Sequence, residues 1–152
     1  MTTTQETATG RGMVELATFY VGEALCGMDL LNIQEINKLM EMTSVPQSPE
    51  YVLGILNLRG QIITVIDMAD KLGLSSTPKN SSSRNIIVNS KDEHIGFLVS
   101  QISDVEKAHW NKVEPPPANI GGVQGNFFKG VFKTKERLIG ILDVEKVLAE
   151  DV

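Results

Sequence analysis

Short runs of apolar residues, interrupted by glycine and polar residues, dominate the chain. Most of these runs have the length and the β-branched content of strands, and few are bounded by helix-capping residues. The strand-like runs occupy residues 14–21, 25–30, 51–58, 61–66, 85–89, 94–99, 127–132 and 137–142. This pattern predicts an all-β fold with only short helices.

The segment 29–42 is ambiguous, because its apolar residues fit two periods. Leu30, Ile33 and Ile36 could form one face of a helix, whereas the residues from Ile33 onward could also begin a strand. We expect a short turn followed by a strand.

Two short helices are expected, each directly after an aspartate that ends an apolar strand. Asp67 precedes residues 68–73, and Asp143 precedes residues 144–149. A carboxylate in this place can accept the free amide protons of the first helical turn. We therefore interpret both aspartates as structural caps rather than as catalytic acids.

The two helical segments belong to an internal repeat. Asp67 and Asp143 each lie 13 residues after a glycine, Gly54 and Gly130, and the residues between align without a gap at an offset of 76. Residues 26–36 align on 95–105 at an offset of 69, with glycine, isoleucine and acidic positions in common. A longer loop in the second half explains the difference between the two offsets, because surface loops lengthen at small entropic cost.

The repeat predicts how the chain is organised. Each half, residues 13–74 and 84–150, would hold about five strands and one terminal helix. Because a unit of ~60–70 residues is near the lower limit for an independent core, the halves are expected to share an apolar interface. We predict two five-stranded barrels, one from each half, within a single domain over residues 13–150. A single sandwich of ten strands is the alternative.

Two polar segments flank the first half. Residues 1–12 lack apolar anchors and are expected to be a disordered leader, and residues 75–83 have the composition of a flexible linker. The start of the chain does not resemble a secretory signal, and no window approaches the ~20 apolar residues that cross a bilayer. We expect a cytoplasmic protein without direct membrane insertion.

Composition and charge exclude several classes of function. The 152 residues include 14 Lys and Arg against 19 Asp and Glu, and the net charge of -5 argues against nucleic acid as the main partner. Cys26 is interpreted as a buried structural thiol, and the distant His94 and His109 predict no metal site. Known catalytic motifs are absent from the sequence, so we expect no enzymatic activity and no cofactor.

Two segments of the second half have a composition that could indicate a binding site for phosphate or nucleic acid. The glycine-rich segment 121–125 reads as a mobile loop, since it opens no predicted helix that could bind phosphate. The segment 129–137 carries a local excess of positive charge, which fits a solvated strand edge better than a nucleic-acid site. A small β-barrel protein that binds nucleic acid through this segment is the alternative function.

Arg59 stands in a tight turn between two apolar strands. Gly60 permits the positive φ that such a turn requires, so the arginine projects from a rigid place. From the residues alone, Arg59 is equally compatible with a solvated turn residue and with a binding arginine of the kind enriched at interfaces.

The sequence around this turn resembles the CheW-like family of bacterial chemotaxis coupling proteins. The resemblance rests on Asn57-Leu-Arg-Gly-Gln-Ile-Ile-Thr-Val-Ile-Asp-Met68, and it extends to residues 27–36, 45–54 and 138–143. It covers about residues 13–150, nearly the whole chain. One departure is Thr64, where the family often has proline.

The resemblance implies two five-stranded SH3-like barrels and a non-enzymatic adaptor. Such an adaptor couples the cytoplasmic tips of methyl-accepting chemoreceptors to the CheW-like regulatory domain of a histidine autokinase, in arrays at the inner membrane. No residue can be assigned to the kinase contact. By position, the resemblance places the receptor contact at Ile33, Glu35, Asn57, Leu58 and Arg59, with Gly54, Gly60, Asp67 and Asp143 as turn or structural residues.

Overall fold

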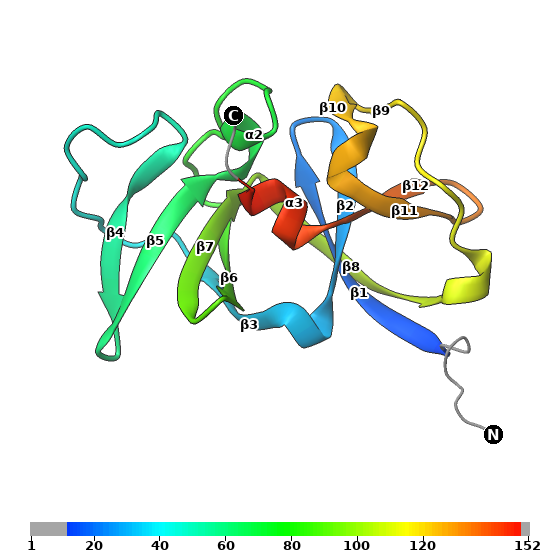
Figure 1. The fold of residues 1–152 in the computed structure, drawn as a ribbon, viewed down its shortest axis with the longest axis horizontal. Helices are drawn as coiled ribbons and strands as arrows, with labels where there is room; N and C mark the ends of the chain where they lie inside the picture. The colour runs from blue at the N-terminus through cyan, green and yellow to red at the C-terminus, as the bar shows by residue number, and fades with distance from the viewer. Residues whose placement is uncertain (1–11, 150–152) are drawn as a thin grey trace.

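The computed structural model describes residues 12–149 and contains two five-stranded sheets, a small hairpin and short helices (Figure 1). The strands are β1 (Met13–Val21), β2 (Ala24–Asp29), β3 (Ile33–Lys38), β4 (Val52–Leu58), β5 (Gln61–Asp67), β6 (Arg84–Ser90), β7 (Glu93–Val99), β8 (Gln101–His109), β9 (Asn119–Ile120), β10 (Val123–Gln124), β11 (Phe128–Lys133) and β12 (Leu138–Leu142). The helical segments are η1 (Leu30–Asn32), α2 (Met68–Lys71), η2 (Trp110–Lys112), η3 (Gly125–Phe127) and α3 (Val144–Leu148).

The predicted all-β fold with short helices is confirmed. Each of the strand-like runs forms a strand, and the ambiguous segment forms the turn η1 followed by the strand β3. The long strand β8 was not among the predicted strands, because its outward positions are polar or charged and interrupt the apolar pattern. Residues 1–11 of the expected leader lie outside the described residues.

The two sheets form two separate SH3-like barrels, which excludes the ten-stranded sandwich. Barrel 1 has the strand order β11-β12-β2-β1-β8, and barrel 2 has the order β3-β6-β7-β5-β4. The expectation that each half forms its own barrel is therefore wrong. The hairpin β1–β2 joins strands of the second half, and the hairpin β6–β7 joins strands of the first half (Figure 1). Both arrangements satisfy the same hydrophobic pattern, so the pattern could not distinguish them.

The exchange of hairpins preserves the internal repeat in three dimensions. Read from β4 to β3, barrel 2 has the order β4-β5-β7-β6-β3, in which each strand corresponds to its repeat partner in barrel 1. The parallel pairings also correspond, with Thr64 beside Ile95 in barrel 2 and Gly140 beside Cys26 in barrel 1. The strands β4 and β11 carry a bulge immediately before Gly54 and Gly130. The repeat is thus a property of strand order, register and irregularities, in addition to sequence.

Three apolar clusters form the core. The largest lies between the barrels and is built from both hairpins, with Phe19 and Met28 on one side and Ile86 and Phe97 on the other, all fully buried. Each barrel also has its own smaller interior cluster, which includes Leu16 in barrel 1 and Ile87 in barrel 2. The shared cluster joins the two barrels into one unit, as expected for halves too small to fold alone.

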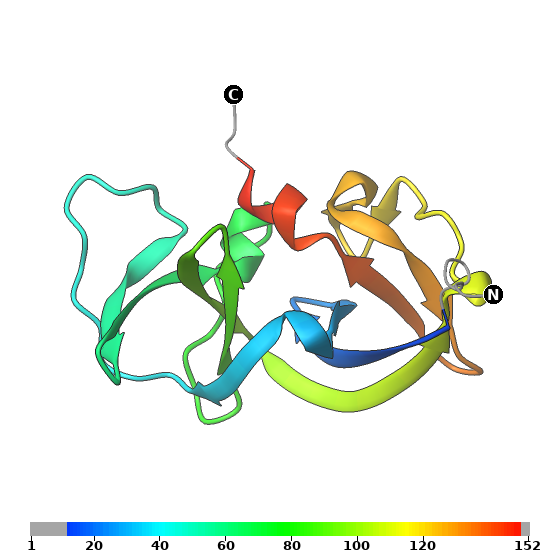
Figure 2. The same cartoon turned by 60° about the horizontal axis from the view of Figure 1, so that its bottom comes forward.

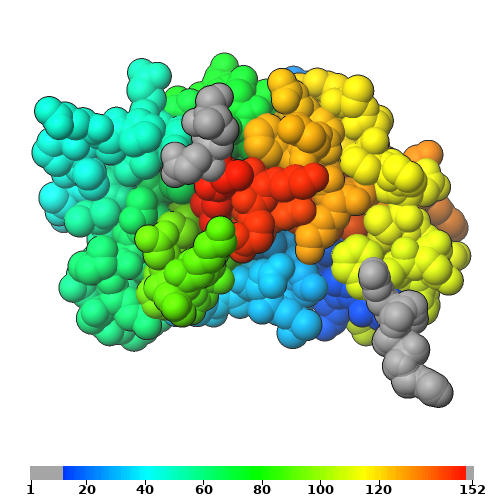
Figure 3. Space-filling view, in the orientation of Figure 1, coloured from blue at the N-terminus to red at the C-terminus, as the bar shows by residue number. Residues whose placement is uncertain are grey.

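The helices α2 and α3 begin at capping aspartates. The Asp67 carboxylate accepts hydrogen bonds from the amides of Ala69 and Asp70, and Asp143 accepts one from the amide of Lys146. Figure 3 shows α3 over the junction of the two barrels, where Glu145 accepts a 2.9 Å hydrogen bond from Ser90 of barrel 2. The helix that follows barrel 1 is thereby attached to barrel 2.

Two segments that were expected to be flexible are anchored. In the expected linker, Thr77 is buried and bonds to Asp67 through its amide and its hydroxyl, at 2.9 and 2.6 Å. In the expected mobile loop 121–125, Val123 from β10 joins the shared core, as does Ile120 from β9 just before it. Both expectations rested on local composition, which does not show that a few side chains of a polar segment are buried.

Candidate functional site

The turn between β4 and β5 has the geometry that its sequence predicts. Arg59 and Gly60 are its two central residues, and both have positive φ, at 52° and 83°. This is the conformation of a tight two-residue hairpin that follows the twist of its strands. The Asn57 side chain accepts a 3.0 Å hydrogen bond from the Gly60 amide and closes the turn. Arg59 is therefore held on a short, rigid hairpin tip.

The Arg59 guanidinium forms an ion pair with Glu35 on β3. The arginine side chain is 67% exposed and the glutamate side chain 26%, so the pair lies at the rim of barrel 2 with the arginine facing solvent. The other carboxylate oxygen of Glu35 accepts a 3.0 Å hydrogen bond from Asn37 Nδ2. The strands β3 and β4 are the two edge strands of this sheet. Glu35 lies on β3 and Arg59 directly follows β4, so the ion pair links the two edges of the sheet across barrel 2.

Polar side chains beside the ion pair extend the site, and sequence reasoning missed them. The bulge in β3 falls at Gln34, whose amide reaches Gln61 at 3.4 Å and the His94 ring at 3.1 Å. These three residues come from β3, β5 and β7. They lie 27 and 60 positions apart in the chain, so no local motif could have indicated that they meet.

Apolar side chains surround the polar groups of this rim. Ile33 is half-buried against the shared core, and Leu58 is half-buried against the interior cluster of barrel 2. Ile62 is 56% exposed and Ile36 is 37% exposed. The strand period could have indicated the exposure of Ile62, because it must point to the face opposite that of the fully buried Ile63. Figure 2 shows β3 and β8 along the same lower side of the molecule, and β8 adds the exposed Val105.

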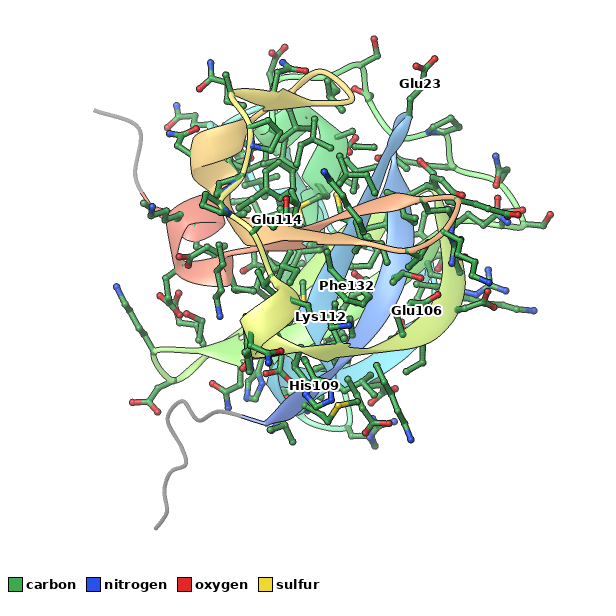
Figure 4. All side chains as sticks on the ribbon, turned by 90° about the vertical axis from the view of Figure 1, so that its right-hand side faces the viewer. Glu23, Glu106, His109, Lys112, Glu114 and Phe132 are labelled. Atoms are coloured by element: carbon green, nitrogen blue, oxygen red, sulfur yellow. The ribbon has the colours of Figure 1, made fainter. Side chains whose placement is uncertain are left out.

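The corresponding rim of barrel 1 is built differently. Arg137 contacts Glu106 at 3.2 Å, Asp104 at 3.7 Å and Ser103 at 3.2 Å, and its side chain is only 28% exposed. Interactions with the Tyr20 and Glu106 side chains raise the pKa of Arg137, against the opposing effect of desolvation. Figure 4 views this end of the molecule, with Glu106 on β8 and Phe132 on β11.

The basic segment considered for nucleic acid is part of this second rim. Arg137 is paired with carboxylates, and Lys133 lies 3.6 Å from Glu114. A positive surface for phosphates needs cations without acidic neighbours. The segment therefore offers no support for nucleic-acid binding.

Gly54 has a structural role near the site. The strand β4 approaches Thr43 closely, and two 2.8 Å backbone hydrogen bonds join Thr43 and Ile55. A Cβ atom on Gly54 would lie 2.7 Å from the Thr43 carbonyl oxygen. Only glycine fits this contact, which fixes the strand that leads to the Arg59 turn.

The remaining candidate chemistry is limited to one cysteine. Burial raises the pKa of the Cys26 thiol to about 12, so the thiol is protonated and inert at neutral pH. Within residues 12–149, no group of histidine, cysteine and acidic side chains could hold a metal ion. The same residues contain no helix of the length and apolarity needed to span a bilayer.

Comparisons with known proteins agree with this architecture. The CheW-like domain matches residues 15–152. The chain is 31% identical to the chemotaxis protein CheW of Helicobacter pylori, over 91% of this chain and 84% of that protein. It is 34% identical to the chemotaxis protein CheW of Thermotoga maritima, over 90% of this chain and 88% of that protein. The crystal structure of the scaffolding protein TtCheW from Thermoanaerobacter tengcongensis superposes with a TM-score of 0.82 at 31% identity, covering 91% and 89% of the two chains. The chain belongs to the CheW-like domain family.

Proposed function

We propose that this protein is a non-enzymatic adaptor that couples transmembrane chemoreceptors to a histidine autokinase in a chemotaxis-type pathway. Its relatives are chemotaxis proteins, and a structural neighbour is a scaffolding protein. An adaptor needs surfaces rather than a catalytic centre, and the paired barrels offer two such ends. The protein would work in the cytoplasm and be recruited to receptor arrays at the inner membrane.

The observation that carries the proposal is the rim of barrel 2. There an exposed arginine is fixed by a tight turn and an ion pair, next to half-buried and exposed isoleucines. A receptor tip is a helical hairpin with apolar and charged positions, which suits a surface that combines apolar strands with a few fixed charges. Ile33 would supply apolar contact, and Glu35 and Arg59 would set the register through charge-assisted hydrogen bonds.

Asn57 and Leu58 support this rim in different ways. Asn57 closes the turn through its bond to the Gly60 amide, and Leu58 is partly covered by the interior of barrel 2. We propose that Asn57 acts on the receptor contact through the shape of the turn. Leu58 would contribute its exposed part to the apolar border.

The second partner would be the CheW-like regulatory domain of the kinase. A domain of the same fold can pair with this chain barrel to barrel, so that adaptor and kinase alternate in an array. The proposal assigns the receptor to the Arg59 rim and leaves the kinase to another surface, since one adaptor must hold both partners together.

The direct test is reconstitution of the complex. The full chain is mixed with a receptor-tip fragment and the kinase regulatory domain at micromolar concentrations, and the mass of the complex is measured by analytical ultracentrifugation. A ternary complex is expected. Arg59→Glu should remove the receptor fragment while the kinase domain stays bound, and Lys129→Glu, an equal charge reversal on exposed barrel 1 surface, should remove neither. Failure of both pairwise interactions would overturn the proposed function.

A further inference from the structure

A row of three hydrogen-bonded side chains lies on the rim of barrel 2 that also carries Arg59. The His94 ring contacts Gln34 at 3.1 Å, and the Gln34 amide donates to Gln61 at 3.4 Å. Gln34 immediately precedes Glu35 in the chain, and Gln61 lies two residues after Arg59. Both glutamines are therefore sequence neighbours of the two residues of the ion pair, and His94 adds a titratable group to the same rim.

The order of donors and acceptors along this row identifies the nitrogen of His94 that carries the proton. Gln34 uses its Nε2 to donate to Gln61, so its Oε1 is the atom that accepts from the His94 ring. The neutral ring therefore carries its proton on Nδ1, and its Nε2 is an acceptor. Within residues 12–149, this Nε2 has no hydrogen-bond partner. The half-buried ring thus keeps one nitrogen unused by the fold.

Protonation of His94 changes what the rim offers to a partner. Histidine is the residue type that gains or loses its charge between about pH 5 and 8. Both nitrogens of the charged ring are donors, so Nε2 changes from an acceptor to a donor and a second positive charge joins Arg59 on the rim. The bond from Nδ1 to Gln34 also becomes charge-assisted, which polarises the bond from Gln34 to Gln61.

The other charges around His94 do not oppose this protonation. The charged residues of the surrounding elements are Glu35 on β3, Arg59 in the β4–β5 turn, and Lys91, Asp92 and Glu93 in the β6–β7 hairpin. Glu93 points to the face opposite that of His94, because successive side chains of a strand alternate. The register partners of His94, Asn89 on β6 and Ile63 on β5, are uncharged. Since three of the five charged residues are acidic, a further positive charge is balanced by the existing anions.

Barrel 1 shows that the fold does not require a histidine at this position. In the repeat, Gln34, Gln61 and His94 correspond to Ser103, Arg137 and Leu25. The contact between the first two positions is preserved, since Arg137 donates to Ser103 at 3.2 Å. Leu25 is buried in the interior cluster of barrel 1 and has no polar side-chain group. The titratable side chain therefore distinguishes the barrel whose arginine is exposed.

We infer that His94 is a specificity-determining residue of this rim, which in its protonated form binds an acidic group of the partner together with Arg59. An exposed arginine already favours a carboxylate, and a charged imidazole on the same rim adds a second cationic donor. The rim should therefore bind an acidic surface more tightly in mildly acidic solution. The receptor tip as the partner rests on the proposed function, whereas the coupling of His94 to the two glutamines does not.

The coupling is tested by NMR of the full-length protein. The chain has two histidines, so His94→Gln removes the proposed group and His109→Gln, at an exposed position of β8, is the matched control. The side-chain amide signals of Gln34 and Gln61 are followed from about pH 8 to about pH 5. They should shift together with the His94 ring signals in the wild type and in His109→Gln. In His94→Gln they should no longer depend on pH.

The specificity is tested by calorimetric titration with a receptor-tip fragment that contains no histidine. The wild type and His109→Gln should bind about threefold more tightly at about pH 5.5 than at about pH 8, the effect of one added surface ion pair. His94→Gln should bind equally at both pH values. His94→Leu, which copies barrel 1, is the second neutral variant and should behave in the same way. Thermal unfolding shows whether each variant is folded.

The outcomes separate this inference from the proposed function. Glutamine signals that do not follow the protonation of His94, or a pH dependence of binding that survives in a folded neutral variant, would overturn the inference. A fragment that binds the wild type equally at both pH values would overturn the specificity role and leave the proposed function intact. A fragment that binds at neither pH would overturn the proposed function and the specificity role, and the glutamine signals would still decide the coupling.

Discussion

The two barrels share one topology but differ at their interiors and rims. In barrel 1 the interior is apolar at Leu16, and Arg137 is enclosed by three polar partners. In barrel 2 the corresponding interior position is Asn85, and the arginine of the turn is mostly exposed. The repeated fold therefore encloses the arginine at one rim and leaves the arginine exposed at the other, where we propose that the partner binds.

The difference between the rims is one of exposure more than of charge. Each rim pairs an arginine with a glutamate, and the two glutamates are similarly exposed, at 26% for Glu35 and 27% for Glu106. The arginines differ, at 67% for Arg59 and 28% for Arg137. An exposed ion pair contributes little to stability, so its fixed geometry is better explained by an interaction with a partner.

The largest expected effect is the loss of the apolar interior of barrel 1. Leu16→Asn should lower the free energy of unfolding by about 3 kcal/mol or more, because it removes a buried apolar side chain and buries an unpaired amide. The reciprocal Asn85→Leu should change it by less than about 1 kcal/mol, since buried polar groups replaced by apolar ones are often nearly neutral. Urea unfolding followed by Trp110 fluorescence measures both. Equal losses in the two variants would contradict the contrast between the interiors.

Two left-handed glycines provide the next comparison. Gly121→Ala, at a φ of 56°, would place a Cβ atom 2.8 Å from Ala24 Cα and should cost about 2–3 kcal/mol of unfolding free energy. Gly60→Ala, at a φ of 83°, meets no atom within 4 Å and should cost only the backbone strain of about 1 kcal/mol. Denaturant titrations of the two variants test this order. A larger cost at Gly60 would show that the β4–β5 turn is packed more tightly than the structure indicates.

The pH dependence of the free energy of unfolding tests the burial of the Cys26 thiol in barrel 1. The repeat partner of Cys26 in barrel 2 is Ile95, which has no titratable group. The folded pKa of about 12 lies above the ordinary cysteine value of 9.0, so the folded state keeps the thiol proton when the unfolded state loses it. Stability is fully present below about pH 9 and should decrease as pH rises toward 12, by up to about 1.4 kcal/mol per pH unit. Cys26→Val should remove this part of the decrease in unfolding titrations. An identical pH profile in the variant would mean that the thiol does not titrate on unfolding.

The smallest effect on stability is expected at the exposed arginine. Arg59→Ala should change the free energy of unfolding by no more than about 0.5 kcal/mol, because its ion pair is exposed to solvent. Arg137→Ala should destabilise the protein more, since it leaves three polar side chains without their partner. Differential scanning calorimetry compares the two variants directly. The reverse order would make Arg59 a structural arginine.

Much of the fold could be predicted because its determinants are local. Alternating apolar residues gave the strands, and the spacing from Gly54 to Asp67 and from Gly130 to Asp143 gave the repeat. The exchange of hairpins could not be predicted, because pairing within or between the halves buries the same side chains. The strand β8 was missed since an edge strand needs only one apolar face, and Asp104 and Glu106 occupy its rim.

The candidate site could be predicted only in part. The turn at Arg59 and Gly60 followed from local chemistry, and the resemblance to the family indicated Glu35 as a neighbour in function. The contacts of Gln34 with Gln61 and His94 depend on the closure of barrel 2, which no local signal reports. Asn85, buried in the interior of the same barrel, carries no signal at all in sequence, because an asparagine in a strand is equally compatible with an exposed position.

Paired charge reversals test most directly whether the rim of barrel 2 is the functional one. Arg59→Glu and Arg137→Glu are compared by calorimetric titration of the full chain with a receptor-tip fragment, at a temperature where both variants are folded. Arg59→Glu should weaken binding by about tenfold or more, the effect expected for an arginine at the centre of an interface, and Arg137→Glu by less than about twofold. Equal losses in both variants, or undiminished binding in Arg59→Glu, would contradict the assignment of binding to barrel 2.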